Sequence, residues 1–254
     1  MTVIKMSPGY KSYRRSFDHS YTLGVYPTLE LLIHRPKITS SVILDSKGAK
    51  NQGVVKIRSL CRRQGIEIIE SDRLVEKLSR RGNTYAVGVF QKESQPVEFQ
   101  KNHLVLVHPA SRGNLGTIMR TMAGYENNDL VIIEPAADPF DPRVVRASMG
   151  AIFQLRLSRY DQFADYWGTF PGHHLYPLMT DGEQPLPRVD FQLPWALIFG
   201  EESSGLGKEY HQYGTSIRIP HSEAVDSLNL AVAVGVCLYQ TRIGNPDSAQ
   251  AAEG

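Results

Sequence analysis

Residues 195–207 read WALIFGEESSGLG and residues 217–239 read IRIPHSEAVDSLNLAVAVGVCLY, and these two runs decide the fold. The apolar run Ala196–Phe199 predicts a buried strand that ends in a glycine loop. Ile217–Ile219 predicts a second strand, which Pro220 ends. From Ser227 onward the chain is apolar on nearly all sides for about three turns, which predicts a buried helix with Ser227 as its N-cap. Two polar loops at strand ends thus flank one buried helix, and ligands bind at such strand ends in open parallel α/β sheets.

The remaining pattern predicts two α/β domains with a polar linker between them. The elements expected in the first domain, residues 1–90, are the strands Ser41–Leu44, Ile66–Ile69 and Tyr85–Phe90 and the helices Thr28–His34, Gln52–Gln64 and Asp72–Arg80. Residues 91–102 are the expected linker, and residues 103–245 are the second domain. Its expected elements are the strands His103–Val107, Leu130–Ile133, Phe153–Leu157 and Leu175–Leu178, a helix ending at Ala123, the helices Val144–Met149 and Asp161–Phe170, and a polar loop at Glu183–Leu193. This order favours a mostly parallel sheet with helices on both faces, followed by a disordered tail at residues 246–254.

Charge divides the chain into a basic and an acidic part. Residues 1–100 hold 17 Lys and Arg against 9 Asp and Glu, whereas residues 101–254 hold 11 against 17. This asymmetry favours a polyanion held by the first part, although small domains also vary this much by chance. No run is long enough to cross a bilayer and the N-terminus lacks a signal-peptide core, so no membrane association is expected. Cys61 and Cys237 are interpreted as reduced thiols of a cytoplasmic protein.

Three polar loops follow predicted strands. In the first loop, Asn114 is expected to cap the next helix, and Arg120 can grip a phosphate or a carboxylate. The second loop, Gly200–Gly207, has glycines that suit a tight turn whose amides face a ligand. The third loop places Ser227 and Asn229 at the start of the buried helix. Each loop taken alone is also compatible with ordinary capping or with a solvated turn.

Signatures of several other enzyme classes are absent. The sequence contains no G-x-G-x-x-G, no P-loop, no G-x-S-x-G and no H-x-E…C-x-x-C pattern. His173 and His174 are adjacent and are interpreted as loop residues, so no metal site is expected. Dehydrogenases, NTPases, serine hydrolases and zinc deaminases therefore lose support.

Taken in order, the three loops resemble the SpoU/TrmH family of SPOUT RNA methyltransferases. The first family motif is Asn-x-Gly-x-x-x-Arg, the second is Gly-x-Glu with a following Gly-Leu, and the third is Ile-Pro, a gap and Ser-Leu-Asn. The matching residues are Asn114, Gly116 and Arg120 in the first, Gly200, Glu202, Gly205 and Leu206 in the second, and Ile219, Pro220, Ser227, Leu228 and Asn229 in the third. His221 and Glu223 stand where the family usually has Met and Gly. The resemblance covers residues 103–243, and residues 10–90 are similar, more loosely, to the small ribosomal-protein-like domain that recognises RNA in many members.

The resemblance implies an α/β fold with a mostly parallel C-terminal sheet, a deep trefoil knot and the small N-terminal α/β domain. It implies S-adenosylmethionine as the cofactor, lined by Gly200, Ile219 and Leu228. The implied reaction is methyl transfer to a ribose 2′-hydroxyl of rRNA or tRNA, carried out by a homodimer formed through the C-terminal domain. Two alternatives stay open: a non-catalytic RNA-binding protein on the same scaffold, and an α/β enzyme that acts on a small molecule.

The chemistry requires the hydroxyl to lose its proton while it is aligned with the S–CH₃ bond, and alignment of this kind can be worth roughly 7–11 kcal/mol. We expect Arg120 to grip the neighbouring phosphate and polarise the hydroxyl. Asn114, Ser227 and Asn229 are expected to orient the hydroxyl, and Glu202 is expected to fix Arg120 or Asn114. The candidates for phosphate contacts in the first domain are Lys11, Arg14, Arg15, Lys56, Arg58, Arg62 and Arg63, which a solvated helix face would also explain in part.

Overall fold

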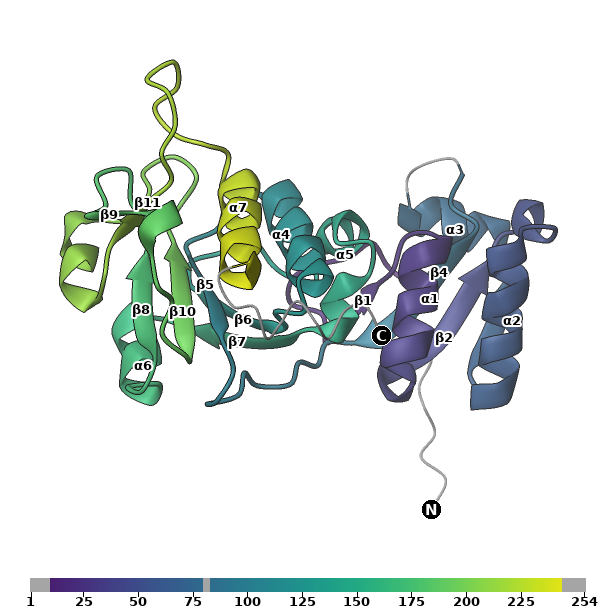
Figure 1. The fold of residues 1–254 in the computed structure, drawn as a ribbon. Helices are drawn as coiled ribbons and strands as arrows, with labels where there is room; N and C mark the ends of the chain where they lie inside the picture. The colour runs from purple at the N-terminus through teal and green to yellow at the C-terminus, as the bar shows by residue number, and fades with distance from the viewer. Residues whose placement is uncertain (1–9, 80–82, 244–254) are drawn as a thin grey trace. The chain divides into compact units, whose positions relative to one another are not determined.

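The computed structural model describes residues 10–79 and 83–243, so the tail expected to be disordered at residues 246–254 lies outside the described residues. The chain divides into two compact units (Figure 1). Unit 1 comprises the chain up to Lys92 together with Phe140–Gly150, and unit 2 comprises Glu93–Pro139 and the chain from Ala151 onward. Each unit has a sheet and a hydrophobic core of its own.

Unit 1 is built on a four-stranded sheet of order β1-β4-β2-β3. Its elements are β1 (His19–Tyr21), α1 (Val25–His34), β2 (Thr39–Leu44), α2 (Gln52–Gln64), β3 (Glu67–Glu70), α3 (Asp72–Ser79) and β4 (Ala86–Gln91). Val42 and Leu44 of β2 pack against α1 and α2, whereas Ile43 packs toward α3. Because successive strand side chains point to opposite faces of a sheet, this alternation places α1 and α2 on one face and α3 on the other.

The ends of α2 are set by the residues next to it. The side-chain oxygen of Asn51 accepts hydrogen bonds from the backbone N–H groups of Gly53 and Val54. Gly65 follows the helix in the left-handed conformation, with φ at 67°. The predicted bounds of this helix, Gln52–Gln64, are confirmed, because an Asn N-cap and a left-handed glycine are both local signals.

A segment from the second half of the chain folds with unit 1. It contains α5 (Pro142–Ala147), which contacts β1. The Ser20 hydroxyl donates a hydrogen bond to the Phe140 carbonyl. A Cβ atom on Gly150 would lie 2.7 Å from the Cβ of Glu30, so this position requires glycine. Unit 2 is therefore interrupted in sequence, a feature that the continuous second domain expected above does not include.

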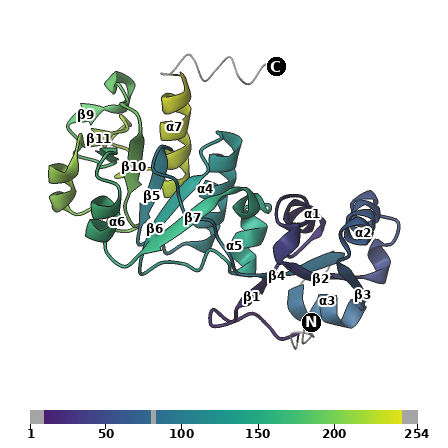
Figure 2. The same ribbon diagram turned by 90° about the horizontal axis from the view of Figure 1, so that it is seen from below.

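Unit 2 is built on a five-stranded sheet of order β7-β6-β5-β10-β8, in which all neighbouring pairs are parallel. Its main elements are β5 (His103–Val107), α4 (Arg112–Gly124), β6 (Asp129–Ile133), β7 (Arg156–Tyr160), α6 (Phe163–Thr169), β8 (His174–Pro177), β10 (Trp195–Phe199) and α7 (Leu230–Ile243). Phe163 and Tyr166 of α6 pack in one core cluster with Val105 and Val131 of the sheet. Helices α4 and α7 lie side by side (Figures 1 and 2). The predicted α/β fold with a mostly parallel sheet is confirmed.

Two predictions for unit 2 are wrong in their local structure. The strand expected at Phe153–Leu157 begins only at Arg156, because Ala151–Gln154 forms a 3₁₀ turn. The loop expected at Glu183–Leu193 contains the short strand β9 (Gln184–Pro185), which pairs in parallel with β11 (Ile217–Arg218). The second difference comes from pairing with residues that are distant in sequence. Among the described helices, none combines the length and apolar character that a bilayer crossing requires.

The loop prediction is confirmed for His173, which lies in a bend before β8, and is wrong for His174. His173 is buried, and its ring stacks on the fully buried ring of His103 with centroids 4.1 Å apart. The Nδ1 atom of His103 lies 3.1 Å from the Tyr166 hydroxyl, and its Nε2 atom lies 2.8 Å from the Glu98 carbonyl. His174 begins β8. The local sequence shows no sign of this core cluster, because its partners come from three separate segments.

Candidate functional site

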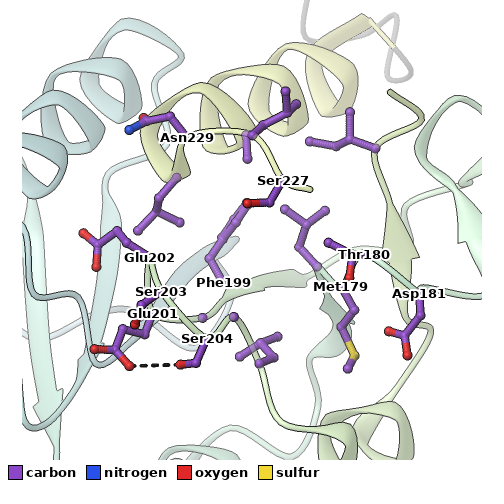
Figure 3. Close-up of a pocket in the computed structure, with 18 of the residues that line it drawn as sticks. Met179, Thr180, Asp181, Phe199, Glu201, Glu202, Ser203, Ser204, Ser227 and Asn229 are labelled. Atoms are coloured by element: carbon purple, nitrogen blue, oxygen red, sulfur yellow. Dashed lines mark hydrogen bonds between the residues drawn. The ribbon is translucent and has the colours of Figure 1, made fainter. Parts of the chain in front are cut away.

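A cavity of about 520 Å³ opens at the carboxyl ends of β8 and β10 (Figure 3). Its walls come from residues 178–181 after β8, residues 199–206 around the end of β10, and the segment between β11 and α7. Parallel strands bring their carboxyl ends to one edge of the sheet, so loops that are far apart in sequence meet there. All of these residues belong to unit 2.

The loop after β10 is closely folded. A Cβ atom on Gly200 would lie 2.1 Å from the carbonyl carbon of Gly205, so no other residue fits at position 200. Gly205 has a φ of 68°, in the region that favours glycine. The Ser204 hydroxyl donates to the Glu201 carboxylate at 3.0 Å, a contact drawn in Figure 3. The two glycines and this contact hold the backbone of the loop against the cavity.

Glu202 joins this loop to the start of α4. Its carboxylate accepts hydrogen bonds from the backbone N–H groups of Ala110 at 3.2 Å and Ser111 at 3.1 Å, and from the Asn114 side-chain amide at 3.3 Å. Partial burial by itself raises the pKa of Glu202, but these donors and its own backbone N–H outweigh burial, so the pKa is lowered. The group is therefore an anion at neutral pH and acts only as a hydrogen-bond acceptor.

Asn229 completes a chain of three side chains. Its amide nitrogen donates to the side-chain oxygen of Asn114 at 3.2 Å, so Asn229, Asn114 and Glu202 form one hydrogen-bonded row. The side-chain oxygen of Asn229 accepts the backbone N–H of Ala231 at 2.9 Å. Asn229 is therefore the N-cap of α7, and the predicted cap Ser227 is wrong.

The predicted cap of α4 is also wrong. The hydroxyl of Ser111 accepts the backbone N–H of Asn114 at 3.3 Å and caps the helix, which begins at Arg112. Asn114 lies inside the first turn, where its side chain is engaged by Glu202 and Asn229. The sequence offered several polar residues as caps at both helices, and only the contacts across the sheet edge decide between them.

The structure gathers most of the predicted site residues and leaves one apart. Gly200, Ile219 and Leu228, predicted to line the cofactor, all line the cavity, as do Glu202, Ser227 and Asn229. Arg120 is exposed on α4 and is not part of the cavity wall. Within residues 10–79 and 83–243, its guanidinium has no hydrogen bond or ion pair. Glu202 therefore fixes Asn114 and not Arg120.

Sequence reasoning missed the wall formed by residues 178–181. Asp181 lines the cavity on the side opposite Glu201 and Glu202 (Figure 3). Its carboxylate lies 3.3 Å from Nε2 of His211, and Nδ1 of His211 lies 3.0 Å from the hydroxyl of the buried Ser216. The missed signal was position: this segment directly follows a predicted strand, Leu175–Leu178, at the same edge of the sheet as the other loops.

The cavity wall has an unbalanced charge. Asp181, Glu201 and Glu202 contribute three carboxylates, and no Lys or Arg is among the lining residues, all of which the structure describes. A site for phosphates normally presents cations or several free N–H groups. The cavity is instead suited to a ligand that carries positive charge.

The basic residues predicted to contact RNA lie on both faces of unit 1. Lys56, Arg62 and Arg63 are exposed on α2. The segment that carries Lys11, Arg14 and Arg15 packs through Tyr10 and Tyr13 into the cluster on the opposite face of the sheet. Arg58 forms an ion pair with Glu70, so its charge is already compensated. One flat RNA surface thus cannot contact all seven residues at once.

No group of three or more metal-binding side chains was found in the described part of the chain. The two cysteines are free and buried, Cys61 in unit 1 and Cys237 in unit 2. Burial raises the pKa of Cys61 to about 11 and that of Cys237 to about 12. Both thiols are therefore protonated and unreactive at neutral pH.

Comparisons with known proteins match the part of the chain that carries this site. The sequence profile described as the SpoU rRNA Methylase family matches residues 101–239. A protein of Synechocystis named an uncharacterised tRNA/rRNA methyltransferase is 35% identical over 142 residues, which are 55% of this chain and 52% of that protein. A tRNA (cytidine(34)-2′-O)-methyltransferase of Beijerinckia indica is 34% identical over 141 residues, which are 53% of this chain and 86% of that protein.

A solved structure extends the similarity to nearly the whole chain. The AdoMet-bound rRNA methyltransferase of Sinorhizobium meliloti aligns with a TM-score of 0.76 at 24% identity, covering 89% of this chain and 87% of that one. At this identity the match shows the fold alone. The chain spans about half the length of the Synechocystis relative, whereas the family profile covers more than half of this chain. The chain belongs to the SpoU rRNA methylase family.

Proposed function

We propose that the protein transfers a methyl group from S-adenosylmethionine to a ribose 2′-hydroxyl of RNA. The observation that carries the proposal is the hydrogen-bonded row Glu202–Asn114–Asn229 at the rim of a cavity with an acidic wall. The relative from Beijerinckia indica is named for the same reaction on tRNA. The relative from Synechocystis and the structure from Sinorhizobium meliloti leave the choice between tRNA and rRNA open.

The cavity fits the proposed cofactor in size and in charge. At about 520 Å³ it lies in the range of small-molecule sites, roughly 300–1,000 Å³. S-adenosylmethionine has one net positive charge at neutral pH, which matches a wall of carboxylates without lysine or arginine. Gly200, Ile219 and Leu228 would hold it, and the tight loop at Gly200 presents backbone groups to it. The bound cofactor supplies an electrophilic methyl group on a sulfonium.

The residues around the row would position the acceptor. Glu202 fixes Asn114, and the amides of Asn114 and Asn229 together with the Ser227 hydroxyl orient the ribose 2′-oxygen. With the cofactor bound, the oriented 2′-oxygen would accept the methyl group, its proton would pass to water, and the neutral thioether would be the leaving group. Arg120 is exposed and unpaired within the described residues, so its five N–H donors are available to an RNA phosphate.

A homodimer accounts for an exposed apolar stripe on α7. The sequence predicted a fully buried helix, but Val232, Val236, Tyr239 and Ile243 are 53%, 38%, 55% and 54% exposed. Their spacing puts them on one face of the helix. A second copy of the chain covering this stripe would place the exposed Arg120 of the neighbouring helix α4 near the subunit interface.

The deep trefoil knot of the family is part of the proposal, supported by the position of the late strand β10 between β5 and β8.

Unit 1 would contribute RNA affinity, as the ribosomal-protein-like domain that residues 10–90 resemble. Its exposed cations on α2 are suited to phosphate contacts, with Arg58 excluded by its ion pair. Deletion of residues 1–90 is not a clean test, because α5 folds with this unit and contacts β1, which the deletion removes. We place the reaction in the cytoplasm, because two buried free thiols suit a reducing compartment.

The test is transfer of labelled methyl groups to bulk RNA, followed by nuclease mapping of the labelled nucleotide. We expect label on a 2′-oxygen with wild-type protein and strongly reduced label with Asn114→Ala. Arg120→Lys should lower turnover or RNA affinity, because a lysine cannot form the bidentate contact. RNA binding without label, together with no calorimetric signal for S-adenosylmethionine, would instead establish the non-catalytic RNA-binding protein.

A further inference from the structure

We infer that Asp181 and Glu201 make the cavity selective for the cationic, methyl-carrying form of the cofactor over its neutral demethylated product. The inference rests on the proposed function and adds the residues that discriminate the two forms. It starts from the position of the two carboxylates on opposite walls of the same cavity (Figure 3).

Asp181 is oriented by a row of hydrogen bonds behind it. The backbone N–H of Glu183 donates to the Ser216 hydroxyl at 3.1 Å, and that hydroxyl lies 3.0 Å from Nδ1 of His211. Nε2 of His211 lies 3.3 Å from Oδ1 of Asp181. Because the Ser216 oxygen accepts the amide proton, its own proton can go to Nδ1, and the Nε2–H of His211 then faces Asp181. The row therefore orients the carboxylate of Asp181, and it contains no lysine or arginine.

Glu201 provides the second charge, whereas the charge of Glu202 is already engaged. Glu202 accepts three hydrogen bonds from residues 110–114 and is half-buried against the start of α4. Glu201 has one side-chain donor, the Ser204 hydroxyl at 3.0 Å. No lysine or arginine on the cavity wall compensates Asp181 or Glu201. These two residues therefore supply most of the negative potential that a bound ligand meets.

The two forms of the cofactor differ by one positive charge. The methyl-carrying form has a sulfonium, and the product left after transfer has a neutral thioether. A wall of carboxylates attracts the first more strongly than the second, so it favours loading of the donor and release of the product. In a partly solvated site, the interaction of one carboxylate with one nearby cation changes the affinity for the cation by about five- to tenfold. The same wall disfavours nucleotides, whose phosphates are anionic.

The experiment measures binding by calorimetry with the full chain and three probes. These are S-adenosylmethionine, S-adenosylhomocysteine, and the analogue sinefungin, in which a protonated amine replaces the methylsulfonium. The variants are Asp181→Asn and Glu201→Gln, which keep shape and remove charge, together with the double variant. Asp165→Asn, an exposed carboxylate on α6 outside the cavity, is the matched control. Circular dichroism and thermal melting confirm that each variant is folded.

We expect each single variant to weaken binding of both cationic probes about five- to tenfold and to change binding of the neutral product less than twofold. The double variant should further lower the ratio of the affinity for the cationic probes to the affinity for the neutral product. Asp165→Asn should leave all three affinities unchanged. Added salt should reduce the preference of the wild-type protein for the cationic probes. An equal loss of affinity for all three probes would show a structural effect and would overturn the inference. A ratio of the affinities for the cationic and neutral probes that is the same in the variants as in the wild type would overturn it as well. If the wild-type protein binds none of the probes, the proposed function fails and the inference fails with it.

Discussion

Replacing Glu202 by Gln tests whether one carboxylate holds two segments of the site together. The carboxylate accepts the Ala110 N–H on one oxygen and Ser111 N–H and the Asn114 amide on the other. A glutamine side chain has only one oxygen, so its amide nitrogen must face an N–H donor on one of the two sides. At least one donor is left without a partner, and the remaining bonds lose the assistance of the charge.

The magnitude follows from these contacts. A hydrogen bond to a charged group contributes about 1.5–3 kcal/mol when buried, and Glu202 is only partly buried. We therefore expect Glu202→Gln to lower the free energy of unfolding by about 1–2 kcal/mol. Misplacement of Asn114 by about an ångström should also lower methyl transfer by about 10²-fold. Urea unfolding measures the first quantity, and labelled methyl transfer at saturating RNA measures the second. Glu201→Gln, which removes a carboxylate with one side-chain donor, is the stability control and should change little.

The pH dependence gives the refuting result. The pKa of Glu202 is lowered in the folded protein from its ordinary value of 4.5, so its stabilisation is fully present above pH 4.5 and is lost as the pH falls through the folded pKa. The stability difference between wild type and Glu202→Gln should therefore shrink in the acid range. A difference that stays constant from pH 7 to pH 3, or no difference at pH 7, would refute the role of this carboxylate.

Three further predictions concern other parts of the chain. Burial lowers the pKa of His103 from 6.5 to about 4, so the folded protein binds a proton there less readily than the unfolded chain does. The wild type should therefore lose about 2 kcal/mol of stability between pH 7 and pH 5, measured by urea unfolding. His103→Gln should not show this loss. If the proposed homodimer forms through α7, Val236→Asp should convert it to a monomer in sedimentation equilibrium, whereas Val55→Asp, on an exposed site of α2, should leave the mass unchanged. Replacement of both Arg62 and Arg63 by Gln should weaken RNA binding and lower the slope of RNA affinity against salt concentration by about two counterions. An unchanged slope would exclude α2 from the RNA interface.

Local signals account for much of what could be predicted. The helix Gln52–Gln64 was placed correctly because Asn51 and Gly65 set its ends without any help from the rest of the fold. The strand His103–Val107 was placed correctly because a run of five apolar or neutral residues fits a strand buried on both faces. The secondary-structure prediction is wrong where a residue distant in sequence decides the local structure. The strand β9 is an example, because its partner strand β11 lies more than thirty residues away.

The sequence by itself determined the parallel α/β fold of unit 2, the family, and the three loops that carry the site, because apolar periodicity and motif spacing are properties of the chain alone. Only the tertiary structure decided that Asn114 and Asn229 are hydrogen-bonded to each other, that Arg120 stands apart, and that Asp181 lines the same cavity as Asn229. These residues are brought together by the order of strands in the sheet, and that order depends on the pairing of β5 with β10, which lie more than ninety residues apart in sequence. A local pattern can show that a polar residue ends a strand, but not which other strand ends it will meet.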